Sequence, residues 1–87
     1  IVTNYLKVLS NPDRLKILCV LVEGELIVQK IEESTDIHQP TLSQQLTVLR
    51  KNNMVSTRRE GKQIFYQVSD PRILTIMQTL HQLYCAA

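Results

Sequence analysis

The sequence has no tryptophan, one phenylalanine and only two glycines among its 87 residues. With so few aromatic residues, the core must consist mainly of leucine, isoleucine and valine. Two glycines are too few for a glycine-rich loop of the kind that cradles a phosphate. No Ser-His-Asp set and no convergent pair of carboxylates is visible either. These absences argue against an enzyme, so we expect no catalytic residue and no cofactor.

Long apolar runs are missing as well. The longest run, residues 17–22, has six residues, whereas a helix needs about 20 residues to cross a bilayer. We therefore expect no association with a membrane. No signal peptide is visible, and the start at Ile1 leaves open an N-terminal extension.

The composition is that of one folded domain with an uneven distribution of charge. Hydrophobic residues make up 44% and charged residues 21% of the chain, which is typical of globular proteins. Residues 1–38 carry a net charge of −2 and residues 39–87 a net charge of +4. Five basic residues and one glutamate lie within residues 50–62. Such a cluster suits nucleic-acid phosphates, although an ordinary solvated surface has the same pattern.

The segment from residue 39 to residue 51 is the most informative part of the chain. Leu42, Leu46 and Leu49 recur at helical spacing and predict one buried face. The other face carries short polar side chains that both donate and accept hydrogen bonds. A helix of this kind packs on its own protein and reads base edges in the major groove of DNA. The alternative is an ordinary amphipathic surface helix.

Periodicity and capping residues predict the elements before this reading helix. We expect helices over residues 2–9 and 12–22, a short strand over 26–28, a helix over 29–34 and a tight turn over 35–37. Asn11 and Pro12 suit the start of the second helix, which should bury Leu15, Leu18 and Val22 with Ile17 and Leu21 beside them. Gly24 should end that helix in a left-handed cap. The turn should place Asp36 in the left-handed region, giving a helix-turn-helix.

After residue 53 the apolar period changes from helical to alternating. Residues 55–60 and 63–68 predict two strands joined by a turn at Gly61. A basic hairpin directly after a polar-faced helix is typical of a wing, which lies along the DNA backbone. The fold class is therefore mostly α with a small β-hairpin. We expect residues 1–87 to form a single winged helix-turn-helix domain, in the order helix-helix-(strand)-helix-helix-strand-strand-helix.

The last helix should begin at Asp70 and Pro71, and it is apolar over more than one face. The first helix has a similar apolar surplus. We predict that these two helices pack across a two-fold axis and form a homodimer. Its two reading helices would lie about 34 Å apart on a palindromic operator of double-stranded DNA. The alternative is that both helices only close the core of a monomer.

Two sequence strings, NPDRLKIL at 11–18 and QPTLSQQLTVLR at 39–50, resemble the ArsR-type family of dimeric winged-helix transcriptional repressors. The resemblance covers essentially the whole chain. It implies that DNA is contacted from the reading helix and the wing. The matching residues are Gln39, Thr41, Ser43 and Gln44 in the reading helix and Arg58, Arg59 and Lys62 in the wing, to which we add Gln45 and Arg50. His38 departs from the family, which usually has a serine cap there.

Metal sites known in the family have few counterparts in this sequence. Residues 25–29 contain no thiol where arsenic-binding members have cysteines. Only Asp70 and His81 stand where zinc-binding members have ligands, and two weak ligands do not close a tetrahedral site. We expect no metal site.

The two cysteines, Cys19 and Cys85, are placed as in the family's sulfide- or persulfide-sensing subgroup. That resemblance implies a redox-sensing dithiol in a cytoplasmic bacterial repressor, induced by a reactive sulfur species or an oxidant. A disulfide or polysulfide bridge between the cysteines would lower the affinity for the operator. His81, four residues before Cys85, would favour its thiolate. Two alternatives stay open: both cysteines are small buried apolar residues, or the repressor answers a metal or another signal.

Overall fold

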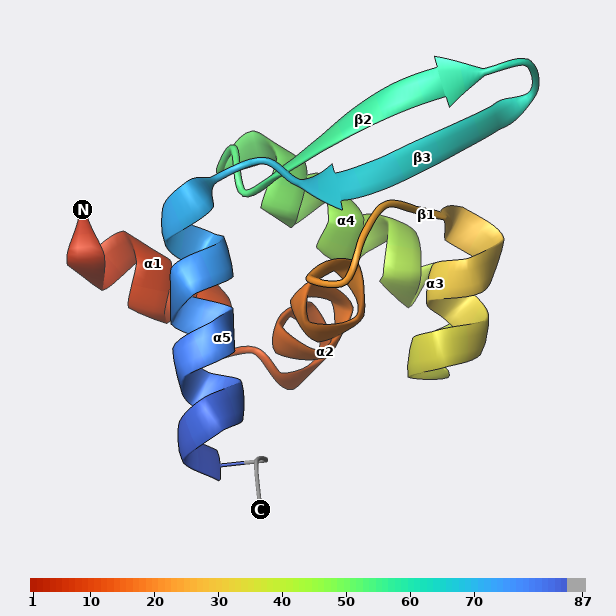
Figure 1. Ribbon diagram of the computed structural model, residues 1–87. Coiled ribbons are helices and arrows are strands. Elements are labelled where there is room, and N and C mark those ends of the chain that lie inside the picture. Colours follow the sequence, from red (N-terminus) through yellow and green to blue (C-terminus); the bar gives the residue numbers. More distant parts are fainter. Residues whose placement is uncertain (85–87) are drawn as a thin grey trace.

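Helices surround one end of a small antiparallel sheet in the computed structural model, which describes residues 1–84 (Figure 1). The elements are α1 (Val2–Leu9), α2 (Pro12–Leu21), β1 (Leu26–Ile27), α3 (Val28–Thr35), α4 (Thr41–Lys51), β2 (Val55–Glu60), β3 (Gln63–Val68) and α5 (Pro71–Tyr84). This order confirms the predicted winged helix-turn-helix. Among the described residues, no helix is both long enough and apolar enough to span a membrane.

The sheet has the strand order β1-β3-β2, and both pairs of neighbours are antiparallel. Strand β1 is only two residues long, and Ile27 pairs with Phe65. The predicted strand over 26–28 is one residue too long, because Val28 already begins α3. Strands β2 and β3 extend away from the helices and form the wing (Figure 1).

The core lies between the helices and the base of the wing. Leu42, Leu46 and Leu49 are at most 2% exposed, which confirms the predicted buried face of α4. Ile31 from α3 and Ile37 from the turn are also buried and belong to the same core cluster. The other buried apolar residues are Val8, Leu9, Ile17, Leu18, Leu21, Met54, Val55, Ile73 and Met77. The core thus consists of aliphatic side chains and methionine.

The buried face of α2 differs from the prediction. Leu18 is buried as expected, but Leu15 and Val22 are only half-buried. Ile17 and Leu21, which were expected beside the buried stripe, lie in the core instead. Helix α2 is central and packs against α1, α3, α4 and β3. Contacts on several sides therefore decide which residues are buried, and a single apolar stripe does not.

Three of the predicted helix ends are confirmed and two are corrected. Asn11 accepts the Arg14 backbone N–H at 3.1 Å, Asp36 is left-handed with φ 59°, and Pro71 begins α5. Gly24, however, has φ 153°, far from the value of about 57° of a left-handed cap. Helix α2 ends at Leu21, and its C-cap residue, Val22, is right-handed. Helix α4 begins at Thr41 and not at residue 39, and Pro40 has the N-cap position.

Candidate DNA interface and thiol groove

The face of α4 opposite its buried leucines is polar and open to solvent. Ser43, Gln44, Thr47 and Arg50 are all exposed on it. Two other predicted DNA-contact residues of this helix, Thr41 and Gln45, are half-buried at its edge. The helix therefore has one face for its own core and one face for a ligand.

Gln39 caps the N-terminus of α4 from outside the helix. Its Oε1 accepts hydrogen bonds from the Ser43 backbone N–H at 3.0 Å and from the Ser43 hydroxyl at 2.6 Å. The sequence alone did not predict this cap, because a glutamine four residues before its partner is not a standard N-cap. Two residues predicted to contact DNA thus hold each other in place, and the Gln39 amide nitrogen remains as a donor.

His38 lies beside this cap and is held by two carboxylates. Its Nδ1 is 3.0 Å from Glu32 Oε2 and its Nε2 is 2.9 Å from Asp36 Oδ1. The hydrogen bond to Glu32, followed by that to Asp36, raises the pKa of the imidazole above its ordinary value of 6.5. A positive charge is therefore favoured at the turn before α4.

Gln45 joins α4 to α2 through an arginine that the sequence did not single out. Its side-chain oxygen accepts a hydrogen bond from Arg14 Nη1 at 3.0 Å. Arg14 Nε also donates to the Val8 carbonyl at 2.8 Å. One guanidinium therefore connects α1, α2 and α4.

The tip of the wing presents basic side chains to solvent. Arg59 and Lys62 are exposed on either side of Gly61, which has φ 62°. Arg59 Nε donates to the Gly61 carbonyl at 3.1 Å. A positive φ is available to glycine without steric cost, so the tight turn keeps both basic residues at the tip.

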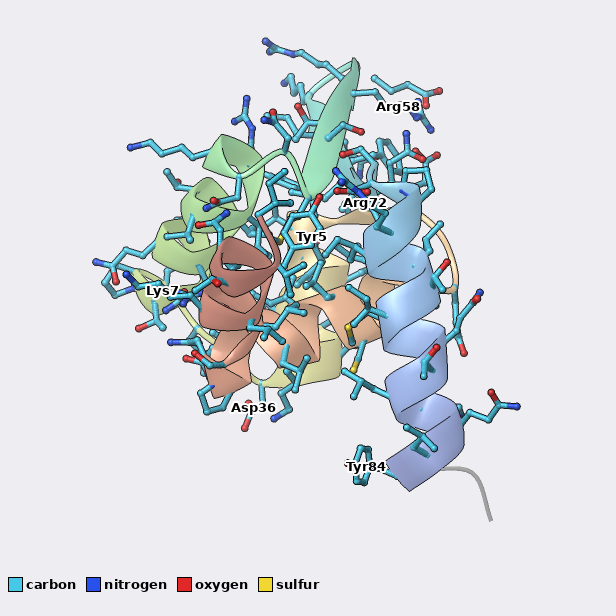
Figure 2. All side chains as sticks on the ribbon, turned by 90° about the vertical axis from the view of Figure 1, so that its left-hand side faces the viewer. Tyr5, Lys7, Asp36, Arg58, Arg72 and Tyr84 are labelled. Carbon is cyan, nitrogen blue, oxygen red and sulfur yellow. The ribbon has the colours of Figure 1, made fainter. Side chains whose placement is uncertain are left out.

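Arg58, the residue before Arg59 in β2, is surrounded by hydrogen-bond acceptors. Its Nε donates to Glu25 Oε2 at 2.8 Å and its Nη1 to Glu60 Oε2 at 2.7 Å. The guanidinium also lies over the Phe65 ring, 4.3 Å from its centroid. Figure 2 shows the side chain at the wing, above α5. The three predicted wing residues thus have different surroundings.

Cys19 is exposed on α2 and lines a groove between α2 and α5. The groove has a volume of about 360 Å³ and is lined by Leu15, Cys19, Met77, Leu80, His81 and Tyr84. Tyr84 lies at the end of α5 remote from Arg72 (Figure 2). Cys85, the second predicted sensing residue, lies outside the described residues. His81, predicted to act on Cys85, lines the same groove as Cys19.

Asp70, one of the two possible metal ligands, has other partners. It accepts hydrogen bonds from the Tyr5 hydroxyl and from Arg72 Nε, and Arg72 lies over the Tyr5 ring (Figure 2). The hydrogen bond from Tyr5 holds the pKa of the carboxyl below its usual value. The described residues contain no group of three or more His, Cys, Asp or Glu that could hold a metal ion.

Comparison with known proteins agrees with this geometry. The family model of bacterial regulatory proteins of the arsR family matches residues 11–57. The chain is 48% identical to the biofilm growth-associated repressor of Xylella fastidiosa, over 98% of this chain and 75% of that protein. It is 39% identical to the transcriptional activator HlyU of Vibrio cholerae, over 94% of this chain and 76% of that protein. These relatives are transcriptional regulators.

Solved structures with the same fold include the crystal structure of the repressor BigR from Xylella fastidiosa. It superposes with a TM-score of 0.93 at 48% identity, over 99% of this chain and 88% of that chain. The homodimeric winged helix-turn-helix DNA-binding domain of Mb0332 from Mycobacterium bovis gives a TM-score of 0.82 at 29% identity, over 94% and 76%. The chain therefore belongs to the ArsR family of bacterial regulatory proteins and is a DNA-binding transcriptional regulator with a winged helix-turn-helix fold.

Proposed function

We propose that two copies of this chain bind a palindromic operator as a repressor in the bacterial cytoplasm. The observation that carries this proposal is the exposed polar face of α4. Glutamine pairs with adenine through two hydrogen bonds, and serine and threonine serve bases or phosphates. Base contacts would come from Gln39, Thr41, Ser43, Gln44 and Gln45, and phosphate contacts from Arg50 and from Arg59 and Lys62 of the wing.

The dimer would form through α1 and α5, which carry apolar side chains that their own subunit leaves uncovered. In α1, Leu6 is 63% exposed and Val2 69% exposed. In α5, Leu83 is 68% exposed and Tyr84 80% exposed. Exposed apolar patches of this kind mark association surfaces. The homodimeric state of the Mycobacterium bovis domain supports the same assembly for this chain.

The affinity for the operator would be switched by oxidation of Cys19 and Cys85. Support comes from the groove between α2 and α5, which is lined by Cys19 and by Tyr84, the residue before Cys85 in the sequence. A persulfide donor would transfer one sulfur to a cysteine thiolate and leave as a thiolate. The second cysteine thiolate would then attack the carbon-bound sulfur, form the disulfide and release hydrosulfide. A bridge across the groove would fix α5 against α2 and change the dimer surface.

The test is a titration of one labelled operator with reduced and with persulfide-treated protein. We expect the treated protein to bind at least about tenfold more weakly, which corresponds to about 1.4 kcal/mol. Cys19→Ser and Cys85→Ser should each keep the affinity of the reduced protein after treatment. Mass spectrometry of the treated protein identifies the bridge. Equal affinity of both forms of the wild type, or a full response in Cys19→Ser, would refute the dithiol switch.

A further inference from the structure

We propose that Arg58 is a positioning residue that fixes the wing, and that its partner in this role is Glu25. A DNA contact is what the charge of Arg58 alone predicts, but its surroundings differ from those of Arg59 and Lys62. The inference rests on the proposed DNA binding by the wing and assigns one residue a specific part in it.

The guanidinium of Arg58 uses each of its nitrogens within the subunit. Nε and Nη2 donate to the two carboxylate oxygens of Glu25, and Nη1 donates to Glu60. Such a two-pronged pair with a carboxylate fixes orientation as well as charge. The Phe65 ring closes one face of the guanidinium plane. Three of its five N–H donors are occupied in this way, and a phosphate that approached Arg58 would meet the carboxylates of Glu25 and Glu60.

The contact spans all three strands of the sheet. Arg58 of β2 is directly opposite Phe65 of β3, and Phe65 is directly opposite Ile27 of β1. Arg58 therefore reaches across the central strand to Glu25, which precedes β1. Glu25 belongs to the turn after α2, so the contact joins the outer strand of the wing to the helical body. Strand β1 contributes only two residues to the sheet, which makes an additional connection at this edge important.

Arg59 is oriented differently because neighbouring residues of a strand point to opposite faces of the sheet. The Arg58 side chain is 46% exposed, but it is packed on Phe65 and paired with Glu25, whereas Arg59 and Lys62 are exposed at the tip. Glu25 also stays ionised, since the hydrogen bonds from Arg58 hold the pKa of its carboxyl below the ordinary value. The wing therefore has a fixed base and a basic tip.

The experiment measures operator affinity against salt for Glu25→Gln, Arg58→Gln, the double variant and Lys62→Gln. We expect Glu25→Gln to weaken binding about two- to fivefold, the range of an exposed ion pair. Removal of a negative charge would by itself strengthen binding to DNA, so the direction of the effect is informative. Arg58→Gln should weaken binding similarly, and the double variant should be no weaker than Arg58→Gln. The salt slope of Arg58→Gln should equal that of the wild type, whereas Lys62→Gln should lower it by about 0.9.

The opposite results would overturn the positioning role. If Arg58 contacts phosphate, Glu25→Gln releases it, so binding becomes tighter and the salt slope steeper. A decrease of about 0.9 in the slope of Arg58→Gln would have the same meaning. Glu33→Gln is the matched control, since it removes an equal charge from the exposed pair of Glu33 with Lys30. This control should leave the affinity unchanged.

A second measurement without DNA separates this inference from the proposed function. Order parameters of the β2 and β3 amides report motion of the wing on the nanosecond scale. They should fall in Glu25→Gln and Arg58→Gln and stay unchanged in Lys62→Gln. Unchanged order parameters in the first two variants overturn the positioning role even if the wild type binds DNA. If the order parameters fall in these two variants but the wild type does not bind an operator, the proposed function alone is contradicted.

Discussion

Leu46 and Gln44 lie two residues apart on opposite faces of α4, so alanine at each position separates packing from DNA recognition. Leu46 is 2% exposed, and replacing a buried leucine by alanine costs about 2–5 kcal/mol. Small domains have a free energy of unfolding of about 0.05–0.15 kcal/mol per residue, or roughly 4–13 kcal/mol for a chain of 87 residues. Leu46→Ala should therefore remove a large part of the stability.

Gln44→Ala should leave the free energy of unfolding nearly unchanged and weaken the binding to DNA. The side chain is exposed, and surface substitutions change the free energy of unfolding by about 0.5 kcal/mol or less. A lost two-pronged contact to adenine costs about 1–3 kcal/mol of binding free energy, which corresponds to a roughly 5- to 150-fold weaker affinity. The salt slope should stay unchanged because no charge is removed.

Urea denaturation followed by circular dichroism and operator titration by fluorescence anisotropy measure the two effects. Both proteins are compared at one concentration, because the stability of a dimer depends on it. The reasoning is refuted if Leu46→Ala is as stable as the wild type. It is equally refuted if Gln44→Ala loses stability but keeps its affinity and its preference for the operator sequence.

Three further substitutions test other parts of the structure. Gly61→Ala should destabilise the protein by about 1–2 kcal/mol through backbone strain alone, since φ is 62° and a Cβ there meets no atom within 4 Å; thermal unfolding measures this loss. Asn11→Ala should cost about 1 kcal/mol in urea denaturation, because the cap on the Arg14 N–H is lost. The raised pKa of His38 implies a stabilising contribution that is full below pH 6.5 and is lost as the pH rises through the folded-state value. The difference in free energy of unfolding between wild type and His38→Gln should therefore shrink with rising pH, and a difference independent of pH would exclude the proposed charge.

Local signals were sufficient to predict most of the fold. The leucine spacing of α4, the Asn11 cap, the left-handed Asp36 and the hairpin around Gly61 each depend on residues close together in the sequence. Side-chain contacts between distant segments were not predictable in this way. The buried face of α2 depends on four neighbouring elements, and no periodicity reports on them.

In the candidate site, too, local features were predictable from the sequence and contacts between distant segments were not. The exposure of Ser43 and Gln44 follows from the helical period alone, and both were predicted as DNA contacts. The partners of Arg58 and Gln45 depend on which segments the fold brings together. Glu25 is 33 residues from Arg58 and Arg14 is 31 residues from Gln45 in the sequence. A basic residue in a strand gives no sign of whether its charge is already paired.

The contacts of Arg14 have a consequence for the spacing of the two operator half-sites that the protein accepts. This side chain ties the Val8 carbonyl of α1 to Gln45 of α4, so the helix offered to a second subunit and the helix offered to DNA are held at one distance. A lysine could not serve both acceptors with the same planar geometry. In the proposed dimer, half-site spacing is therefore a built-in dimension of each subunit, and operators with one base pair inserted at their centre should be rejected.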